Sequence, residues 1–232
     1  MGSAAVVRPT LLSRLSTPLV VGLGCAVIFL VLFAMLAEEM LEGDTRQFDD
    51  TVRLFVHAHS STELTAIMRF LSMIGSPLVV TLIASAACIA LWIGGHPRRA
   101  ILIAVTAGGG SLLMWVLKTG FRRSRPVPFF DTRLPASYSF PSGHAMLSFC
   151  LCLSAAALFS ASRKNLLVRI TIWTFWVGLS GAIGYSRIYL GVHFPSDVIA
   201  GYLAALVWSL TVGSAYQKWR KLPPPPTNTT SG

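Results

Sequence analysis

The sequence is short of charged side chains, and above all of acidic ones. Only 12% of its 232 residues are charged, with 9 Asp and Glu against 19 Lys and Arg. A soluble domain carries roughly 25% charged residues, so this shortage excludes an ordinary soluble protein. In their place 53% of the residues are hydrophobic, and several apolar runs approach the ~20 residues that span a bilayer. The composition therefore predicts a polytopic membrane protein.

Cysteine is also scarce, and its positions exclude two kinds of chemistry. Cys25, Cys88, Cys150 and Cys152 all lie inside apolar runs. No further Cys or His stands near Cys150 and Cys152 to complete a metal-binding set. We interpret the four as small packing residues, and we expect no disulfide, no metal and no other cofactor.

The excess of basic residues gives a net charge of +10. In a soluble protein this charge would favour nucleic-acid binding. Here the basic residues stand in short loops between apolar runs, where membrane topology and anionic headgroups or substrates explain them better. We therefore expect membrane lipids as partners and no nucleic acid.

The apolar runs predict an all-α fold, a polytopic membrane bundle of about six transmembrane helices with one short interfacial helix. The expected spans cover about residues 19–36, 64–93, 100–117, 144–159, 166–185 and 198–216. Gly75-Ser76-Pro77 interrupts the second span and indicates either a kink or an interfacial turn before the span proper. We expect one membrane-embedded domain over residues 1–222 and a disordered, proline-rich tail over 223–232.

The segment between the first two spans is polar and predominantly acidic. Within it Phe48, Val52, Leu54, Phe55 and Val56 form a short amphipathic pattern. This pattern favours a helix lying on the bilayer surface, and an ordinary extramembrane loop remains the alternative.

The distribution of basic residues predicts the orientation. Ten of the 19 Lys and Arg fall in the loops that place both termini in the cytoplasm. Five of the other nine belong to the candidate site described next or to its neighbours, which leaves four on the outer side. The positive-inside rule therefore favours cytoplasmic termini.

Alternating spans bring three distant polar stretches to one face of the membrane. The first, Lys118 to Pro126, ends a span and contains a cluster of cations suited to a multiply charged anion. The second, Pro141-Ser142-Gly143-His144, opens a helix whose free N–H groups can hold an anion, with Ser142 placed to cap the helix. The third, Ser186 to Asp197, contains an arginine, a histidine and a carboxylate.

The third stretch contains the most specific pattern. Asp197 follows His193 by four residues, a spacing that lets a carboxylate hold one ring nitrogen and leave the other as a nucleophile or base. Two histidines beside several cations suit phosphoryl transfer, in which one histidine attacks and the other protonates the leaving oxygen. The sequence therefore predicts a phosphate site at a membrane surface.

Together, Lys118-x6-Arg125-Pro126, Pro141-Ser142-Gly143-His144 and Ser186-Arg187-x5-His193-x3-Asp197 resemble the signature of the type 2 phosphatidic acid phosphatase superfamily. The six-span bacterial lipid phosphatases are the most similar branch. The signature occupies residues 118–197, and the span layout covers nearly the whole chain.

The resemblance implies a role for each signature residue. His193 would be the nucleophile that forms a phosphohistidine, Asp197 would orient it, and His144 would be the general acid. The phosphate would be bound by Lys118, Arg125, Ser142, Gly143 and Arg187. Arg122 and Arg123 lie outside the signature, and we weigh headgroup contacts for them against ordinary surface charge. The family needs no metal.

The implied function is a lipid phosphatase or diphosphatase of a bacterial cytoplasmic membrane, with its site on the outer, periplasmic face. Implied substrates are undecaprenyl diphosphate, phosphatidylglycerol phosphate, phosphatidic acid or a lipid A phosphate. A phosphotransferase of the same fold is a rival, because water and an acceptor alcohol would attack the same phosphohistidine. A non-catalytic transporter or lipid-binding protein is a second alternative, although transport predicts polar residues at mid-span.

Overall fold

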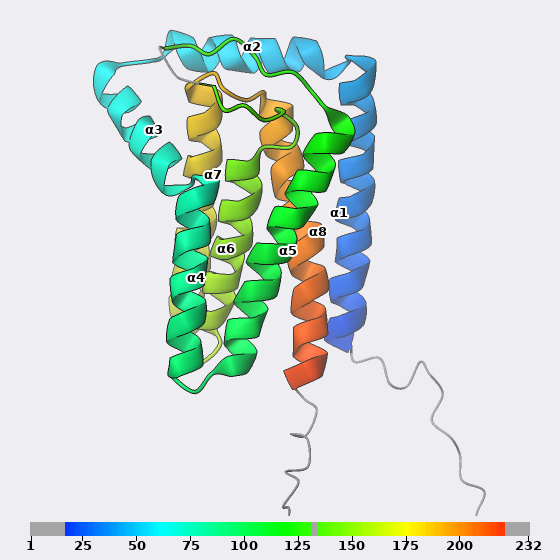
Figure 1. The fold of residues 1–232 in the computed structure, drawn as a ribbon, viewed down its shortest axis with the longest axis vertical. Coiled ribbons are helices and arrows are strands. Elements are labelled where there is room, and N and C mark those ends of the chain that lie inside the picture. Colours follow the sequence, from blue (N-terminus) through cyan, green and yellow to red (C-terminus); the bar gives the residue numbers. More distant parts are fainter. Residues whose placement is uncertain (1–16, 131–133, 221–232) are drawn as a thin grey trace, which may run out of the picture.

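The computed structural model describes residues 17–130 and 134–220, so the tail expected at 223–232 lies outside the described residues. Over these ranges the chain is helical and contains no strand (Figure 1). The helices are α1 (Thr17–Glu42), α2 (Thr45–Ala58), α3 (Thr62–Ile74), α4 (Pro77–Ile93), α5 (Pro97–Phe121), α6 (Gly143–Ser160), α7 (Leu166–Tyr189) and α8 (Pro195–Arg220). The expected all-α bundle is confirmed.

The spans also agree with the expected number. The helices α1, α5, α6, α7 and α8 are each long and apolar enough to cross a membrane, and α3 with α4 makes a sixth span if the bent pair is counted as one. The two members of this pair meet at an angle of 50°. The break falls at the expected interruption, because Pro77 begins α4 and Ser76 caps it by accepting a hydrogen bond from the Val79 N–H at 3.3 Å.

Helix α6 lies at the centre of the bundle, in contact with α4, α5, α7 and α8, while α1 packs along α8 (Figure 1). One apolar core joins α1, α6 and α8 and is made by Phe33, Ala37, Met40, Phe140, Met146, Cys150, Ala200, Ala204 and Ala205. The outward faces of the spans expose large apolar side chains, among them Val27, Ile89 and Phe175. Such faces suit contact with lipid, and the chain is a multi-pass membrane protein.

Helix α2 lies across one end of the bundle and packs on α7 and α8 (Figure 1). The amphipathic pattern correctly predicted a helix here, but it did not predict which face is buried. The buried stripe consists of Thr45, Asp49, Arg53 and Val56, whereas Phe48 is 48% and Phe55 66% exposed. The inward face of α2 is therefore mostly polar, and it lies against the end of the bundle that holds the candidate site.

Candidate active site

The three polar stretches of the sequence meet at the end of the bundle that α2 covers. Here α5 and α7 end and α6 and α8 begin. Backbone hydrogen bonds join the stretches directly: the Ser142 N–H donates to the Asp197 carbonyl at 2.9 Å, and the Ser139 N–H donates to the Arg123 carbonyl at 2.8 Å. Side chains that are up to 79 positions apart in the signature therefore share one site, as the alternation of spans predicted.

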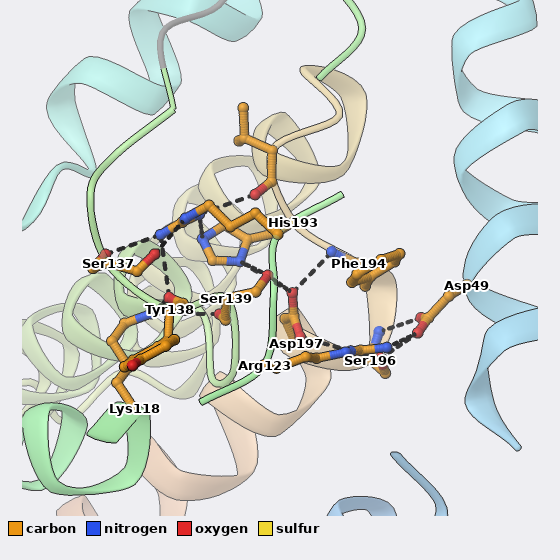
Figure 2. Close-up of polar contacts among 12 residues, drawn as sticks. Asp49, Lys118, Arg123, Ser137, Tyr138, Ser139, His193, Phe194, Ser196 and Asp197 are labelled. Carbon is orange, nitrogen blue, oxygen red and sulfur yellow. Dashed lines mark hydrogen bonds and ion pairs between the residues drawn. The ribbon is translucent and has the colours of Figure 1, made fainter. Parts of the chain in front are cut away.

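His193 and Asp197 form a buried pair at the start of α8 (Figure 2). The helix begins at Pro195 rather than near Val198, so Asp197 lies in its first turn and His193 in the loop just before it. The His193 Nδ1 lies 3.2 Å from the Asp197 Oδ2. Their side chains are 1% and 0% exposed. The four-residue spacing thus brings the carboxylate to one ring nitrogen.

A tight turn at Gly191 brings the chain from α7 back into the site. Its φ is +71°, a left-handed conformation that side chains other than that of glycine rarely adopt. A Cβ atom at this position would also stand 2.5 Å from the Phe129 backbone nitrogen. Glycine is therefore required for the turn that presents His193 two residues later.

Arg125 and Asp197 together determine the tautomer of the His193 ring. Its Nη1 lies 3.0 Å from His193 Nε2, and because an arginine N–H can only donate, Nε2 must be the acceptor. The ring proton is then on Nδ1, where it is donated to Asp197 (Figure 2). The unprotonated Nε2 consequently faces a fixed positive charge, which is the arrangement a nucleophile needs toward a phosphate.

Burial keeps this histidine neutral. The pKa of His193 is lowered to about 3, chiefly by removal from solvent, with Asp197 opposing the shift and Arg125 and Arg187 adding to it. Burial also lowers the pKa of Arg125, and the nearby Asp197 partly offsets this effect. An arginine remains charged at neutral pH in either case. At pH 7 the site therefore holds a neutral imidazole beside a cation.

Lys118 and Arg187 reach the same site from α5 and α7. Lys118 is buried, and its Nζ donates to the Tyr138 carbonyl at 2.5 Å (Figure 2). Arg187 is buried too, and its Nη1 donates to the Ser72 hydroxyl of α3. The Arg187 Nε has no acceptor among the residues that the structure describes. One buried donor of this cation is thus free for a ligand.

The start of α6 supplies the remaining signature residues. Ser142 occupies the N-cap position, but the expected capping bond is absent: its buried Oγ has no partner within residues 17–130 and 134–220. Gly143 allows α5 to pack closely, because a Cβ there would meet the Met114 sulfur at 2.5 Å. His144 is half-buried in the first turn of α6, next to Gly143. The second histidine therefore stands at the same end of the bundle as the first.

The two arginines outside the signature differ from each other. Arg122 is exposed in a left-handed conformation at the end of α5. Arg123 does not make the headgroup contact considered for it, nor is it ordinary surface charge. Its guanidinium is ion-paired with Asp49 at 2.8 Å and with Asp197 at 2.7 Å. The carboxylates hold this side chain inside the protein, so it is not free to extend toward a headgroup.

Sequence reasoning missed several residues that complete the site. Ser139 donates to the Asp197 Oδ2, and Ser72 accepts from Arg187. Asp49 accepts from Ser196 and Arg123 (Figure 2). Ser139 stands two residues before Pro141, so its proximity to the second stretch was the one available signal. No such signal marked Asp49 or Ser72, because both lie far from the signature. Asp49 stands in an acidic segment and Ser72 in an apolar run.

The fold and the site define a class: a multi-pass helical membrane protein with two histidines and several cations at one end of its bundle. The PAP2 superfamily matches residues 99–221, more than half of the chain. The chain belongs to this superfamily, as the signature implied.

Similarity to known proteins extends beyond the signature. The undecaprenyl-diphosphatase of Sulfolobus acidocaldarius is 29% identical over 184 residues, which cover 76% of this chain and 84% of that protein. The phosphatidylglycerophosphatase B of Bacillus subtilis is 34% identical over 116 residues, 49% of this chain and 56% of that protein. The crystal structure of a transmembrane PAP2 type phosphatidylglycerolphosphate phosphatase from Bacillus subtilis matches with a TM-score of 0.76 and 23% identity, over 85% of this chain and 98% of that one. This last likeness shows the shared fold.

Proposed function

We propose that this protein is an integral-membrane lipid phosphatase, which hydrolyses a phosphomonoester or diphosphate of a lipid through a phosphohistidine. The observation that supports it best is the state of His193. Its Nδ1 proton is directed at Asp197, and its unprotonated Nε2 lies 3.0 Å from Arg125. In this proposal the Arg125 N–H turns to the phosphate when substrate binds, which releases the Nε2 lone pair of a neutral imidazole for attack.

In the first step the His193 Nε2 attacks phosphorus and forms an N–P bond, while the P–O bond to the leaving group breaks. The leaving group is a lipid alcohol or, for a diphosphate, a lipid monophosphate. His144 donates a proton to the leaving oxygen. Asp197 stabilises the positive charge that develops on the His193 ring, because its carboxylate accepts a hydrogen bond from the Nδ1–H.

In the second step water attacks the same phosphorus atom. His144, now without its proton, takes one from the water, and the N–P bond breaks. Inorganic phosphate leaves, and both histidines return to their starting states. Every proton in this cycle moves through His144, so the two histidines have separate tasks.

The phosphate oxygens are bound by side chains and backbone groups that have unused hydrogen-bond donors in the site. The buried Nε of Arg187 has no acceptor in the described part of the chain. The buried hydroxyl of Ser142 likewise has no hydrogen-bond partner there. Arg125 and Lys118 add positive charge, and the N-terminus of α6, with Gly143, adds backbone N–H groups. Such preorganised donors stabilise the charge on the transferred phosphoryl group.

We further propose that the substrate is a long-chain lipid phosphate of the undecaprenyl diphosphate or phosphatidylglycerol phosphate type. These are the substrates named for two similar proteins. The positive-inside bias supports cytoplasmic termini and a site on the outer face of a bacterial cytoplasmic membrane. In this proposal residues 1–222 act as one membrane domain, and Arg122, exposed beside the site, contacts headgroups.

The test is phosphate release by the full chain in detergent from prenyl diphosphates, glycerolipid phosphates and lipid A. We expect turnover of at least one class, and His193→Gln should reduce it to background, because the nucleophile is lost. The matched control is His96→Gln, since His96 is exposed at the turn before α5. Full turnover by the His193 variant would contradict the mechanism.

A second measurement addresses the proposed independence from metals. Turnover should be unchanged in EDTA, because the cationic side chains of Lys118, Arg125 and Arg187 supply the charge that a metal would otherwise provide. A loss in EDTA that a divalent cation restores would contradict this part of the proposal.

A further inference from the structure

A buried charge network lies behind the candidate nucleophile and extends outside the signature. Its centre is Arg123, which donates from Nη1 to the Asp197 Oδ1 at 2.7 Å and from Nη2 to the Asp49 Oδ2 at 2.8 Å (Figure 2). Both carboxylates are fully buried, and the arginine side chain is 15% exposed. One guanidinium thus links α2 to the first turn of α8.

Ser196 closes this network on the α8 side. Its backbone N–H donates to the Asp49 Oδ1 at 2.9 Å, and its hydroxyl donates to the Asp49 Oδ2 at 2.6 Å. The same hydroxyl accepts from Arg123 at 2.8 Å. Asp49 therefore holds both Arg123 and the residue next to Asp197, so α2 is attached to the start of α8 at two points.

The Asp197 carboxylate depends on this attachment for its orientation. Its Oδ2 accepts from the Phe194 N–H at 2.9 Å, from Ser139 and from His193. Among side chains, only Arg123 is within hydrogen-bond reach of Oδ1 in the described residues. If Arg123 moves, the carboxylate loses the contact that fixes its rotation, and the hydrogen bond to the His193 Nδ1 weakens.

Arg123 is held where it cannot reach the phosphate instead. Its guanidinium stacks on the Phe194 ring at 4.1 Å, and both of its terminal nitrogens are bound to carboxylates. A buried cation between two buried carboxylates also satisfies charges that would be costly alone. The side chain acts on Asp197 and not on the substrate.

We propose that Asp49 and Arg123 are positioning residues, through which α2 orients Asp197 and so keeps the His193 Nε2 unprotonated and directed at phosphorus. This inference rests on the nucleophilic role proposed for His193. It assigns α2 a part in the chemistry, and it predicts that changes on α2 alter turnover without altering substrate binding.

The first experiment compares two adjacent carboxylates of α2. Asp49→Asn removes the charge that holds Arg123 and should lower kcat about tenfold to a hundredfold with KM unchanged, as for groups that orient a reactive residue. Asp50→Asn is the matched control, because the Asp50 side chain is 52% exposed. Its ion pair with Arg53 is long, with 3.6 Å between the Asp50 Oδ1 and the Arg53 Nη1. Equal kinetics in both variants, or a change in KM alone, would overturn the proposal.

A double variant tests whether Asp49 and Arg123 act together to orient Asp197 or stabilise the fold independently. Arg123→Gln leaves Asp49 and Asp197 buried without their shared cation, and it should lower kcat more than Asp49→Asn does. Adding Asp49→Asn to Arg123→Gln removes the repulsion and should restore kcat at least fivefold. If the two losses multiply instead, Asp49 and Arg123 do not act together on Asp197. Should Arg123→Gln not fold, Arg123→Lys replaces it and should keep part of the activity.

The tautomer of His193 can be measured without substrate, so this proposal can be tested independently of the proposed function. Nitrogen NMR of the chain with labelled histidine should show His193 as the Nδ1-protonated tautomer, assigned by its loss in His193→Gln among only five histidines. In Asp49→Asn and Arg123→Gln this signal should shift toward a mixture of tautomers, and in Asp50→Asn it should not. An unchanged tautomer would contradict the positioning role, whereas a shift in a chain that hydrolyses no lipid phosphate would contradict the proposed function alone.

Discussion

The two halves of the chain contribute to the site in different ways. The segment from α5 to α8, residues 97–220 with the connecting loops, contains every residue of the signature, and the family match falls on this half. Helices α1 to α4, residues 17–93, contain none. Yet the N-terminal half supplies Asp49 and Ser72, which hold Arg123 and Arg187. One half carries the groups that we propose for the reaction, and the other holds two arginines of that half in place.

This division explains why one half is easy to recognise and the other is not. A group that touches phosphorus must be of one chemical type at one position, so it appears as a motif. A group that supports an arginine needs only an acceptor at the correct distance, and a serine on α3 or an aspartate on α2 provides it. Changes in the C-terminal half should therefore remove a reacting or binding group, and changes in the N-terminal half should displace one.

The largest effect that sharpens this comparison is expected at His144 in the C-terminal half. His144→Asn should lower turnover of a lipid phosphate by about 10²–10⁴-fold, the usual contribution of a general acid. The deficit should be much smaller with 4-nitrophenyl phosphate, whose leaving group departs without a proton. Rates for both substrates, with His96→Asn as the control, measure this. If turnover of both substrates fell by the same factor, His144 would not be the general acid.

A smaller effect is expected at Ser72 in the N-terminal half. Ser72→Ala removes the acceptor that holds the Arg187 Nη1, so phosphate binding should weaken while the chemical step continues. A lost hydrogen bond of this kind is worth about 0.5–1.5 kcal/mol, which corresponds to a KM roughly twofold to tenfold higher. Ser85→Ala, at an exposed position of α4, is the matched control. A fall in kcat at constant KM would show that Ser72 does not act through the binding of phosphate by Arg187.

A third effect concerns stability and pH. The pKa of His193 is lowered to about 3 in the folded protein by burial, and an unfolded histidine has a pKa near 6.5. As pH falls below about 6.5 the unfolded chain takes up a proton that the folded site refuses, so stability decreases until about pH 3. At pH 5 the loss is about 2 kcal/mol.

Thermal unfolding in detergent tests this pH dependence. The unfolding temperature of the wild type should fall more steeply between pH 7 and pH 5 than that of His193→Gln, which lacks the titrating group. Parallel curves for the two proteins would show that the buried imidazole does not resist protonation.

Much of the fold and of the reactive groups could be predicted from the sequence. Apolar runs of span length and the break at Gly75-Ser76-Pro77 predicted the helices, and alternation of spans predicted which ends meet. Two details were wrong for physical reasons. Ser142 does not cap α6 with its side chain, and Arg123 turns inward because two buried carboxylates attract it more strongly than the surface does.

The sequence by itself determined the membrane class, the helical bundle and the residues available for phosphate chemistry, because hydropathy and short spacings act locally along the chain. Only the tertiary structure decided the tautomer of His193 and the partners of Arg123 and Arg187. These depend on single hydrogen bonds between atoms more than 60 residues apart. A hydrogen bond forms or fails within a few tenths of an ångström, and no pattern in the order of residues encodes a distance that short.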